Sequence, residues 1–134
     1  MDTRTLLVAD FMTIDPIVVA EDAPLEEAAR LVREYSISGL PVVDDSGALV
    51  GVISETDLLH ARTTDALWRA REGLTVQHLM THPAVAVMSD VSIEHAAHVM
   101  EDRRIHRLVV VDTDGETPIG VLSVSDLVRS MGGG

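Results

Sequence analysis

The chain has 134 residues, of which 46% are hydrophobic, and its formal net charge is −12. A chain of this length can bury one sizeable core, and its acidic charge repels DNA and RNA, so we expect no binding to nucleic acid. Cysteine and lysine are both absent, which excludes disulfides, thiolate metal sites and the lysine of a phosphate-binding P-loop.

The hydrophobic residues are dispersed along the chain. No apolar run reaches the roughly 18 residues that a membrane-spanning helix needs. The N-terminus lacks the basic segment and long apolar stretch of a secretory signal. We therefore expect a cytoplasmic protein that makes no contact with a membrane.

The first predicted elements are a strand and a helix. Residues 17–19 are a β-branched run typical of a strand. Asp22 followed by Pro24 predicts a helix N-cap and first turn. Apolar residues then recur at helical spacing, which predicts an amphipathic helix. These positions are Leu25, Ala28, Ala29 and Val32.

A hairpin and a second helix are predicted next. Residues 40–43 and 49–53 are apolar runs separated by the turn residues 45–47, which indicates a β-hairpin. A short helix is expected to begin near Thr56. An Ala- and Arg-rich helical connector follows over residues 61–73, ended by Gly73. Its Trp68 is expected to pack on a partner or on the edge of the fold.

The second half of the chain repeats the first. Met12 and Thr13 recur 68 residues later as Met80 and Thr81. The phrase at residues 51–57 recurs at residues 120–126 after one extra loop residue. Two copies are too few for a solenoid, which needs about three stacked units. We therefore expect two copies packed around a pseudo-twofold axis with a shared core.

The predicted fold is an α+β, sandwich-like module of two β-α-β-β-α repeats. The repeats are expected at residues 5–62 and 74–131, joined by a connector at residues 63–73. The second copy shows the same signals, and the chain ends in a frayed glycine tail. These signals are a helix through Ile93, Ala96, Ala97 and Met100, strands at residues 108–111 and 119–122 with a turn around Asp114 and Gly115, and a closing helix near Ser125.

Ser54 and Asp57 stand where the first hairpin gives way to its closing helix, and Ser123 and Asp126 are their copies. A helix N-terminus carries unpaired amides and partial positive charge, which suit phosphate. A serine there can bond phosphate, an aspartate one turn later can accept both hydroxyls of a ribose, and the preceding glycines allow a ligand to approach the backbone. The Ser-x-x-Asp pattern is also close to a capping box, which needs no ligand.

His106 and Arg107 distinguish the second copy from the first. Arginine offers planar, bidentate donors that match phosphate. The adjacent Arg103 and Arg104 are expected to be a solvated helix end, where basic residues favour the helix dipole. The equivalent residues to His106 and Arg107 in the first copy are Ser38 and Gly39, so the two copies are not expected to be equivalent.

The histidines favour no metal site. His95 and His98 are three apart on a predicted helix but lie off its apolar face, so a solvated surface is expected. His78 and His82 flank Met80 and have no fixed carboxylate partner, so a zinc site is not expected. Without cysteine, lysine or a clustered Ser/His/Asp set, we expect no catalytic residues and no enzyme.

Together these motifs resemble a tandem pair of cystathionine-β-synthase (CBS) domains, or Bateman module, over residues 8–131. The motifs that support this resemblance occur at matched spacing in both halves, which makes the resemblance specific. They are residues 10–13 with Pro16, 37–44 and 51–57 in the first half, and residues 79–81 with Pro83, 105–112 and 120–126 in the second. The family consists of regulatory modules that bind adenosine-containing ligands in clefts between the repeats and often form disc-shaped dimers.

The resemblance implies a non-enzymatic sensor of AMP, ADP, ATP or a related adenosyl compound. It assigns phosphate and ribose binding to the two Ser/Asp pairs and places His106 and Arg107 at phosphate. The implied ligand-binding residues are Ser54, Thr56, Asp57, His106, Arg107, Ser123, Ser125 and Asp126. No cofactor is required, although Mg²⁺ can accompany the phosphates. We expect a homodimer that signals to a separate effector protein; the alternative is a dimeric protein-interaction module with degenerate, non-binding clefts.

Overall fold

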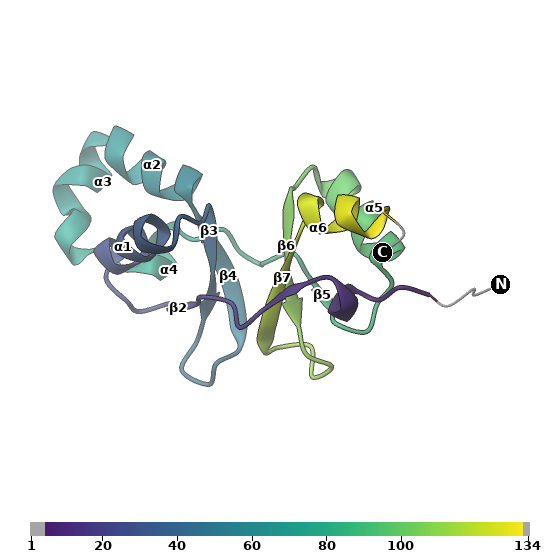
Figure 1. Cartoon of the computed structure of the whole chain (residues 1–134). Helices are drawn as coiled ribbons and strands as arrows, with labels where there is room; N and C mark the ends of the chain where they lie inside the picture. The colour runs from purple at the N-terminus through teal and green to yellow at the C-terminus, as the bar shows by residue number, and fades with distance from the viewer. Residues whose placement is uncertain (1–4, 133–134) are drawn as a thin grey trace. The chain divides into compact units, whose positions relative to one another are not determined.

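The computed structural model describes residues 5–132 (Figure 1). Within these residues the chain divides into two compact units. Residues 17–84 form the first unit, and residues 5–16 together with 85–132 form the second. Gly133 and Gly134 of the expected tail lie outside the described residues. None of the helices in the described range is both long and apolar enough to span a membrane.

The first unit has the predicted order of strand, helix, hairpin and helix. Both helices pack on one face of a three-stranded sheet of order β2-β3-β4, in which β2 and β3 are parallel (Figure 1). The elements are β2 (Val19–Ala20), α1 (Leu25–Tyr35), β3 (Gly39–Val43), β4 (Leu49–Ser54) and α2 (Glu55–Thr63). The connector is helical, as predicted, and leads into a further short helix. These segments are α3 (Asp65–Ala70), η2 (Arg71–Gly73) and α4 (Val76–Leu79).

The second unit repeats this order and adds a strand from the N-terminal segment. Its sheet has the order β1-β7-β6-β5, with β5 parallel to β6 and the other neighbours antiparallel. The N-terminal elements are η1 (Val8–Asp10) and β1 (Thr13–Ile14). The others are β5 (Ala86–Met88), α5 (Ile93–Arg103), β6 (Arg107–Val111), β7 (Pro118–Ser123) and α6 (Val124–Ser130).

Residues 5–16 begin the first repeat but belong to the second unit, and residues 74–84 begin the second repeat but belong to the first unit. We call residues 5–16 and 74–84 the arms. In the first unit, Val52 and Thr81 donate backbone hydrogen bonds to each other's carbonyl, at 3.0 and 2.8 Å. In the second unit, Thr13 of the other arm pairs with Val121. The compact units therefore differ from the repeats at residues 5–62 and 74–131, because the two arms are exchanged.

The repeated glycines make this arm pairing sterically feasible. A Cβ on Gly51 would lie 2.8 Å from both the carbonyl oxygen of Thr81 and the sulfur of Met80. A Cβ on Gly120 would lie 2.8 Å from the carbonyl oxygen of Thr13. The sequence suggested that these glycines admit a ligand, but the backbone that approaches them belongs to the arm.

The arms also complete the hydrophobic cores. The expected single core is replaced by two buried clusters, one in each unit. Val76 of one arm is fully buried in the first cluster, and Val8 of the other arm is fully buried in the second. Each cluster thus gains a buried apolar side chain from an arm. The buried face of α1 includes Ala28 but not Ala29, which is exposed although the sequence placed it on the apolar face.

Helix α1 begins later than predicted. Its N-cap is Pro24 rather than Asp22, and its first residue is Leu25. Pro24 forms an antiparallel bridge with Thr75 of the arm, and the amide of Leu25 donates to the carbonyl of Leu74 at 3.1 Å. The arm therefore holds the backbone extended at Pro24, which delays the helix.

Trp68 packs against its own connector. The guanidinium groups of Arg62 and Arg71 lie 4.5 and 4.2 Å from the centre of the indole ring. Arg71 also donates a hydrogen bond to the carbonyl of Trp68 at 2.7 Å. Cation–π stacking of this kind stabilises an exposed aromatic side chain modestly. The indole thus has contacts within the chain, and its packing on a partner or on the edge of the fold stays a prediction.

We predict that Gly51→Ala and Gly120→Ala destabilise the protein by about 1–3 kcal/mol, because the added methyl overpacks against a backbone carbonyl that cannot move freely. Urea denaturation measures the change. Gly73→Ala is the matched control, since its Cβ would meet no atom within 4 Å. Equal stability of all three variants would show that the arms do not pack tightly against the glycines.

The hairpin turns predict a pH dependence. The hydroxyl of Ser46 donates to Asp44 at 2.6 Å and that of Thr117 donates to Asp114 at 2.6 Å, and these bonds lower the pKa of each carboxyl below 3.8. Their stabilisation is present above the unfolded pKa and is lost as pH falls through the lower folded value. Asp114→Asn should therefore cost more stability at pH 7 than at pH 2, measured by thermal denaturation. Asp45→Asn, in the other turn, controls for the loss of charge.

Candidate functional site

Ser54 and Asp57 form a reciprocal capping box where β4 ends and α2 begins. The amide of Asp57 donates to Ser54 Oγ at 3.1 Å, and the amide of Ser54 donates to Asp57 Oδ2 at 2.9 Å. The Ser54 hydroxyl also donates to Asp57 Oδ2, at 3.0 Å. The capping role that the sequence left open is thus present, and it fixes the orientation of the carboxylate.

Ser123 and Asp126 repeat this geometry between β7 and α6. The amide of Asp126 donates to Ser123 Oγ at 3.2 Å, and the amide of Ser123 donates to Asp126 Oδ2 at 2.8 Å. The Ser123 hydroxyl donates to the same oxygen at 3.0 Å. In both copies, therefore, Oδ2 belongs to the cap and Oδ1 points away from it.

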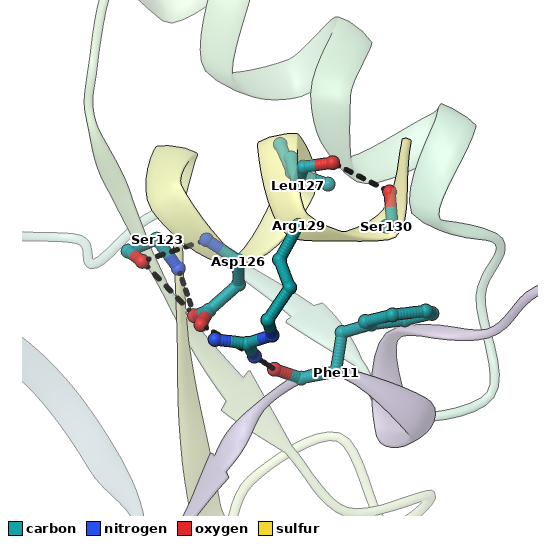
Figure 2. A network of polar contacts seen from close by, with 6 residues as sticks. All are labelled: Phe11, Ser123, Asp126, Leu127, Arg129 and Ser130. Carbon is teal, nitrogen blue, oxygen red and sulfur yellow. Dashed lines mark hydrogen bonds and ion pairs between the residues drawn. The ribbon is translucent and has the colours of Figure 1, made fainter. Parts of the chain in front are cut away.

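The second carboxylate oxygen meets different groups in the two copies. Thr81 of the arm donates its hydroxyl to Asp57 Oδ1 at 3.2 Å. Arg129 donates to Asp126 Oδ1 at 2.9 Å, and the same nitrogen donates to the carbonyl of Phe11 at 3.1 Å (Figure 2). Asp126 is 7% exposed, whereas Asp57 is half-buried. The two copies therefore present carboxylates of unequal charge environment and access.

His106 and Arg107 lie beside the second capping box. Arg107 begins β6 directly opposite Ser123, and opposed residues in an antiparallel pair place their side chains on the same face. The carbonyl of His106 accepts from the amide of Val124 at 3.0 Å, which attaches the helix start to the strand. Both side chains are exposed. In the first unit Gly39, which has no side chain, stands opposite Ser54.

Thr56 and Ser125 occupy the first turn of their helices. Each follows the first helical residue, and each is exposed. Neither takes part in the capping boxes, which use the serine before it and the aspartate after it. Their hydroxyls lie at the helix N-terminus, where the sequence predicted an assisting role.

The remaining basic candidates lie on α5. Arg103 is its last residue and Arg104 is its left-handed C-cap, so the predicted solvated helix end is confirmed. His95 and His98 are exposed, as expected for the polar face. Within residues 5–132, no group of three histidine, aspartate or glutamate side chains is placed to hold a metal ion.

The sequence motifs did not indicate Thr81, Arg129 and Phe11 as neighbours of the carboxylates. A signal existed for Thr81, because the Met-Thr pair of the arm recurs in both halves. Arg129 follows Asp126 by three residues, a spacing that brings side chains together on one helix face. Phe11 contributes only a backbone carbonyl, for which the sequence carries no signal.

The family model of the CBS domain matches this chain twice, at residues 8–63 and 76–133. These matches cover most of the chain and fall on the two halves that the internal repeat defines. The chain therefore belongs to the CBS domain family, and it contains a tandem pair of these domains.

Known relatives agree with this assignment. The chain is 29% identical to inosine-5'-monophosphate dehydrogenase of Aquifex aeolicus over 118 residues, which are 88% of this chain and 23% of that enzyme. The chain thus spans less than a quarter of that relative's length.

Solved structures share the fold. Arabidopsis thaliana CBSX2, in complex with AMP, is 34% identical, with a TM-score of 0.81 and coverage of 94% of this chain and 96% of that one. The CBS domain pair of protein MJ0100, in complex with 5'-methylthioadenosine and S-adenosyl-L-methionine, is 28% identical, with a TM-score of 0.82 and coverage of 97% and 98%. The predicted fold of two β-α-β-β-α repeats is confirmed.

The capping boxes predict a stability effect without any ligand. Ser54→Ala and Ser123→Ala should each lower the free energy of unfolding by about 1 kcal/mol, because a helix N-terminal amide loses its acceptor. The neighbouring Thr56→Ala and Ser125→Ala are matched controls and should stay within about 0.5 kcal/mol of the wild type. Chemical denaturation compares the four variants; indistinguishable serine and control variants would contradict a capping role.

Proposed function

We propose that this protein is a non-enzymatic regulatory module that binds an adenosine-containing ligand through its repeated Ser/Asp motif. The ligand class is AMP, ADP, ATP or a related adenosyl compound. The observation that carries the proposal is the duplicated motif, a serine hydroxyl and an oriented carboxylate at a helix start. The AMP and S-adenosylmethionine complexes of its structural neighbours support this ligand class.

The ribose would bind at the aspartates. The capping bonds use Asp57 Oδ2, so a ribose diol would donate to Oδ1 beside the hydroxyl of Thr81, which lies 3.2 Å from that oxygen. A carboxylate that is already oriented loses little side-chain entropy when the sugar binds. Asp126 occupies the equivalent position in the second copy.

Phosphate would bind at the helix N-termini. The first-turn amides carry partial positive charge, and the hydroxyls of Ser54 and Thr56, or of Ser123 and Ser125, add donors. His106 and Arg107 supply further donors beside the second copy, where Arg107 stands opposite Ser123. A magnesium ion would accompany a di- or triphosphate without a dedicated protein cage.

Regulation would follow from ligand-dependent populations. A ligand shifts a conformational equilibrium only when its affinity for the two states differs. We propose that this module acts as a cytoplasmic homodimer and passes such a shift to a separate effector protein. The catalytic activities of larger relatives need not occur in the matched region, which is a small part of their length.

Thermal denaturation with AMP, ADP, ATP, S-adenosylmethionine and adenosine tests the proposal. A ligand at 100 times its dissociation constant should stabilise the protein by about 2.7 kcal/mol. Asp57→Asn should weaken the response, because the asparagine oxygen can keep the cap while its NH₂ group cannot accept from a ribose hydroxyl.

Asp45→Asn is the control for this experiment, because it removes the same charge from an exposed turn. It should leave the ligand response unchanged. No stabilisation by any compound in the panel would refute adenosyl binding. An equal response of Asp57→Asn and the wild type would remove Asp57 from the site.

One observation favours the second candidate, a dimeric protein-interaction module with degenerate sites. Leu59 and Val128 occupy equivalent positions in the two repeats and are 59% and 60% exposed, and Met131 is 82% exposed. Val128 and Met131 are three residues apart at the end of α6, a spacing that brings side chains together on one helix face, and exposed apolar side chains that lie together are available for association. A stable dimer that is insensitive both to the ligand panel and to Asp57→Ala and Asp126→Ala would favour this function.

A further inference from the structure

We propose that Arg129 closes the second copy of the motif to ribose, so that Asp57 is the principal sugar acceptor of the chain. This inference rests on the proposed adenosyl binding and adds to it a residue that makes the two copies unequal. The contacts of Asp57 lie within the first unit and those of Asp126 within the second.

The donors to Asp126 leave little capacity for a ribose. A carboxylate has about four acceptor positions. The amide and hydroxyl of Ser123 take two of them on Oδ2, and Arg129 binds Oδ1 at 2.9 Å. A ribose diol that donates two hydrogen bonds would therefore have to displace the arginine.

One guanidinium nitrogen of Arg129 makes two hydrogen bonds. The nitrogen that bonds Asp126 also donates to the carbonyl of Phe11, a residue of the N-terminal arm (Figure 2). Charge-assisted hydrogen bonds are roughly twice as strong as neutral ones. The low exposure of Asp126 limits the access of water to its carboxylate, whereas the Arg129 side chain is 63% exposed and its charge is partly screened by solvent.

The corresponding contact on Asp57 is weaker and adaptable. Thr81 is neutral, and its hydroxyl lies 3.2 and 3.4 Å from the two carboxylate oxygens. A hydroxyl can rotate and can itself accept a hydrogen bond, whereas a guanidinium only donates. A ribose can thus join the Thr81–Asp57 pair without breaking an ion pair.

The first copy of the repeat shows which residue stands in the place of Arg129. The residue equivalent to Arg129 in the first copy is His60, three positions after Asp57. The Nδ1 atom of His60 lies 3.4 Å from the hydroxyl of Thr64, at the other end of α2. The arginine that occupies the carboxylate is therefore a feature of the second copy alone.

The two copies consequently offer different chemistry. The first has an accessible sugar acceptor and no arginine beside its serine. The second has Arg107 for phosphate but a sugar acceptor that Arg129 occupies. Adenosine isolates the sugar interaction from the phosphate interaction, because it carries no phosphate.

The test is a titration with adenosine, in which NMR monitors the backbone amides of residues 54–57 and 123–126. In the wild type we expect saturable shifts at residues 54–57 and none at residues 123–126 at the same concentrations. In Arg129→Gln both motifs should respond, and adding Asp126→Asn should abolish the new response. The reciprocal change, His60→Arg, should weaken adenosine binding at the first motif about tenfold.

Two controls separate the role of Arg129 from a general loss of charge or packing. Arg30→Gln removes another arginine that pairs with carboxylates on its own helix, at Glu27 and Glu34, and should behave as the wild type. Arg129→Met retains an unbranched apolar stem and should also open the second motif. If Arg129→Gln unfolds, the wild-type titration and Arg129→Met still decide the question.

Equal adenosine shifts at both motifs of the wild type would overturn this inference while leaving adenosyl binding intact. Failure of both folded Arg129 variants to gain a response at residues 123–126 would also overturn it. If neither adenosine nor AMP binds any variant, the proposed function fails and this inference fails with it.

Discussion

The pairing of each arm with the other repeat is the interaction on which the rest of the structure depends. It requires Gly51 and Gly120, because any side chain there would meet the arm's backbone. Once paired, the arms bury Val8 and Val76 in the two cores. The arm at residues 5–16 also brings the carbonyl of Phe11 to Arg129. Core and candidate site therefore arise from one exchange of segments.

The candidate site uses groups that the fold already needs. In each copy a serine and an aspartate satisfy helix amides that would otherwise lack partners, and the same bonds orient the carboxylate. A capping box and a ligand site are therefore compatible roles for one motif. What distinguishes the copies is the group on Oδ1, a hydroxyl from Thr81 at Asp57 and a guanidinium from Arg129 at Asp126. The capping boxes are the same in the two copies, and the contact at Oδ1 is what differs.

Local sequence signals predicted the local structure well. The hairpins and the helices follow from apolar periodicity and turn residues, and the duplication predicted that each would occur twice. The sequence could not show which repeat each arm joins, because periodicity carries no information on partners. The start of α1 at Leu25, the separate cores and the steric role of Gly51 all follow from that exchange. The contact between Arg129 and Asp126 depends on side-chain conformation, which spacing permits but does not determine.

The reciprocal exchange has a consequence for any chain that holds only one of these repeats. In such a half-length chain no arm would pair with the strand that carries the glycine. The chain's own arm would in turn have no strand to pair with. Both needs can be met by a second copy, so its folding would become a bimolecular, concentration-dependent process. Joining the halves through residues 63–73 replaces that encounter with an intramolecular one at high effective concentration. Duplication thus supplies stability at dilution, and it frees the two copies to diverge, as Arg129 and His60 have done.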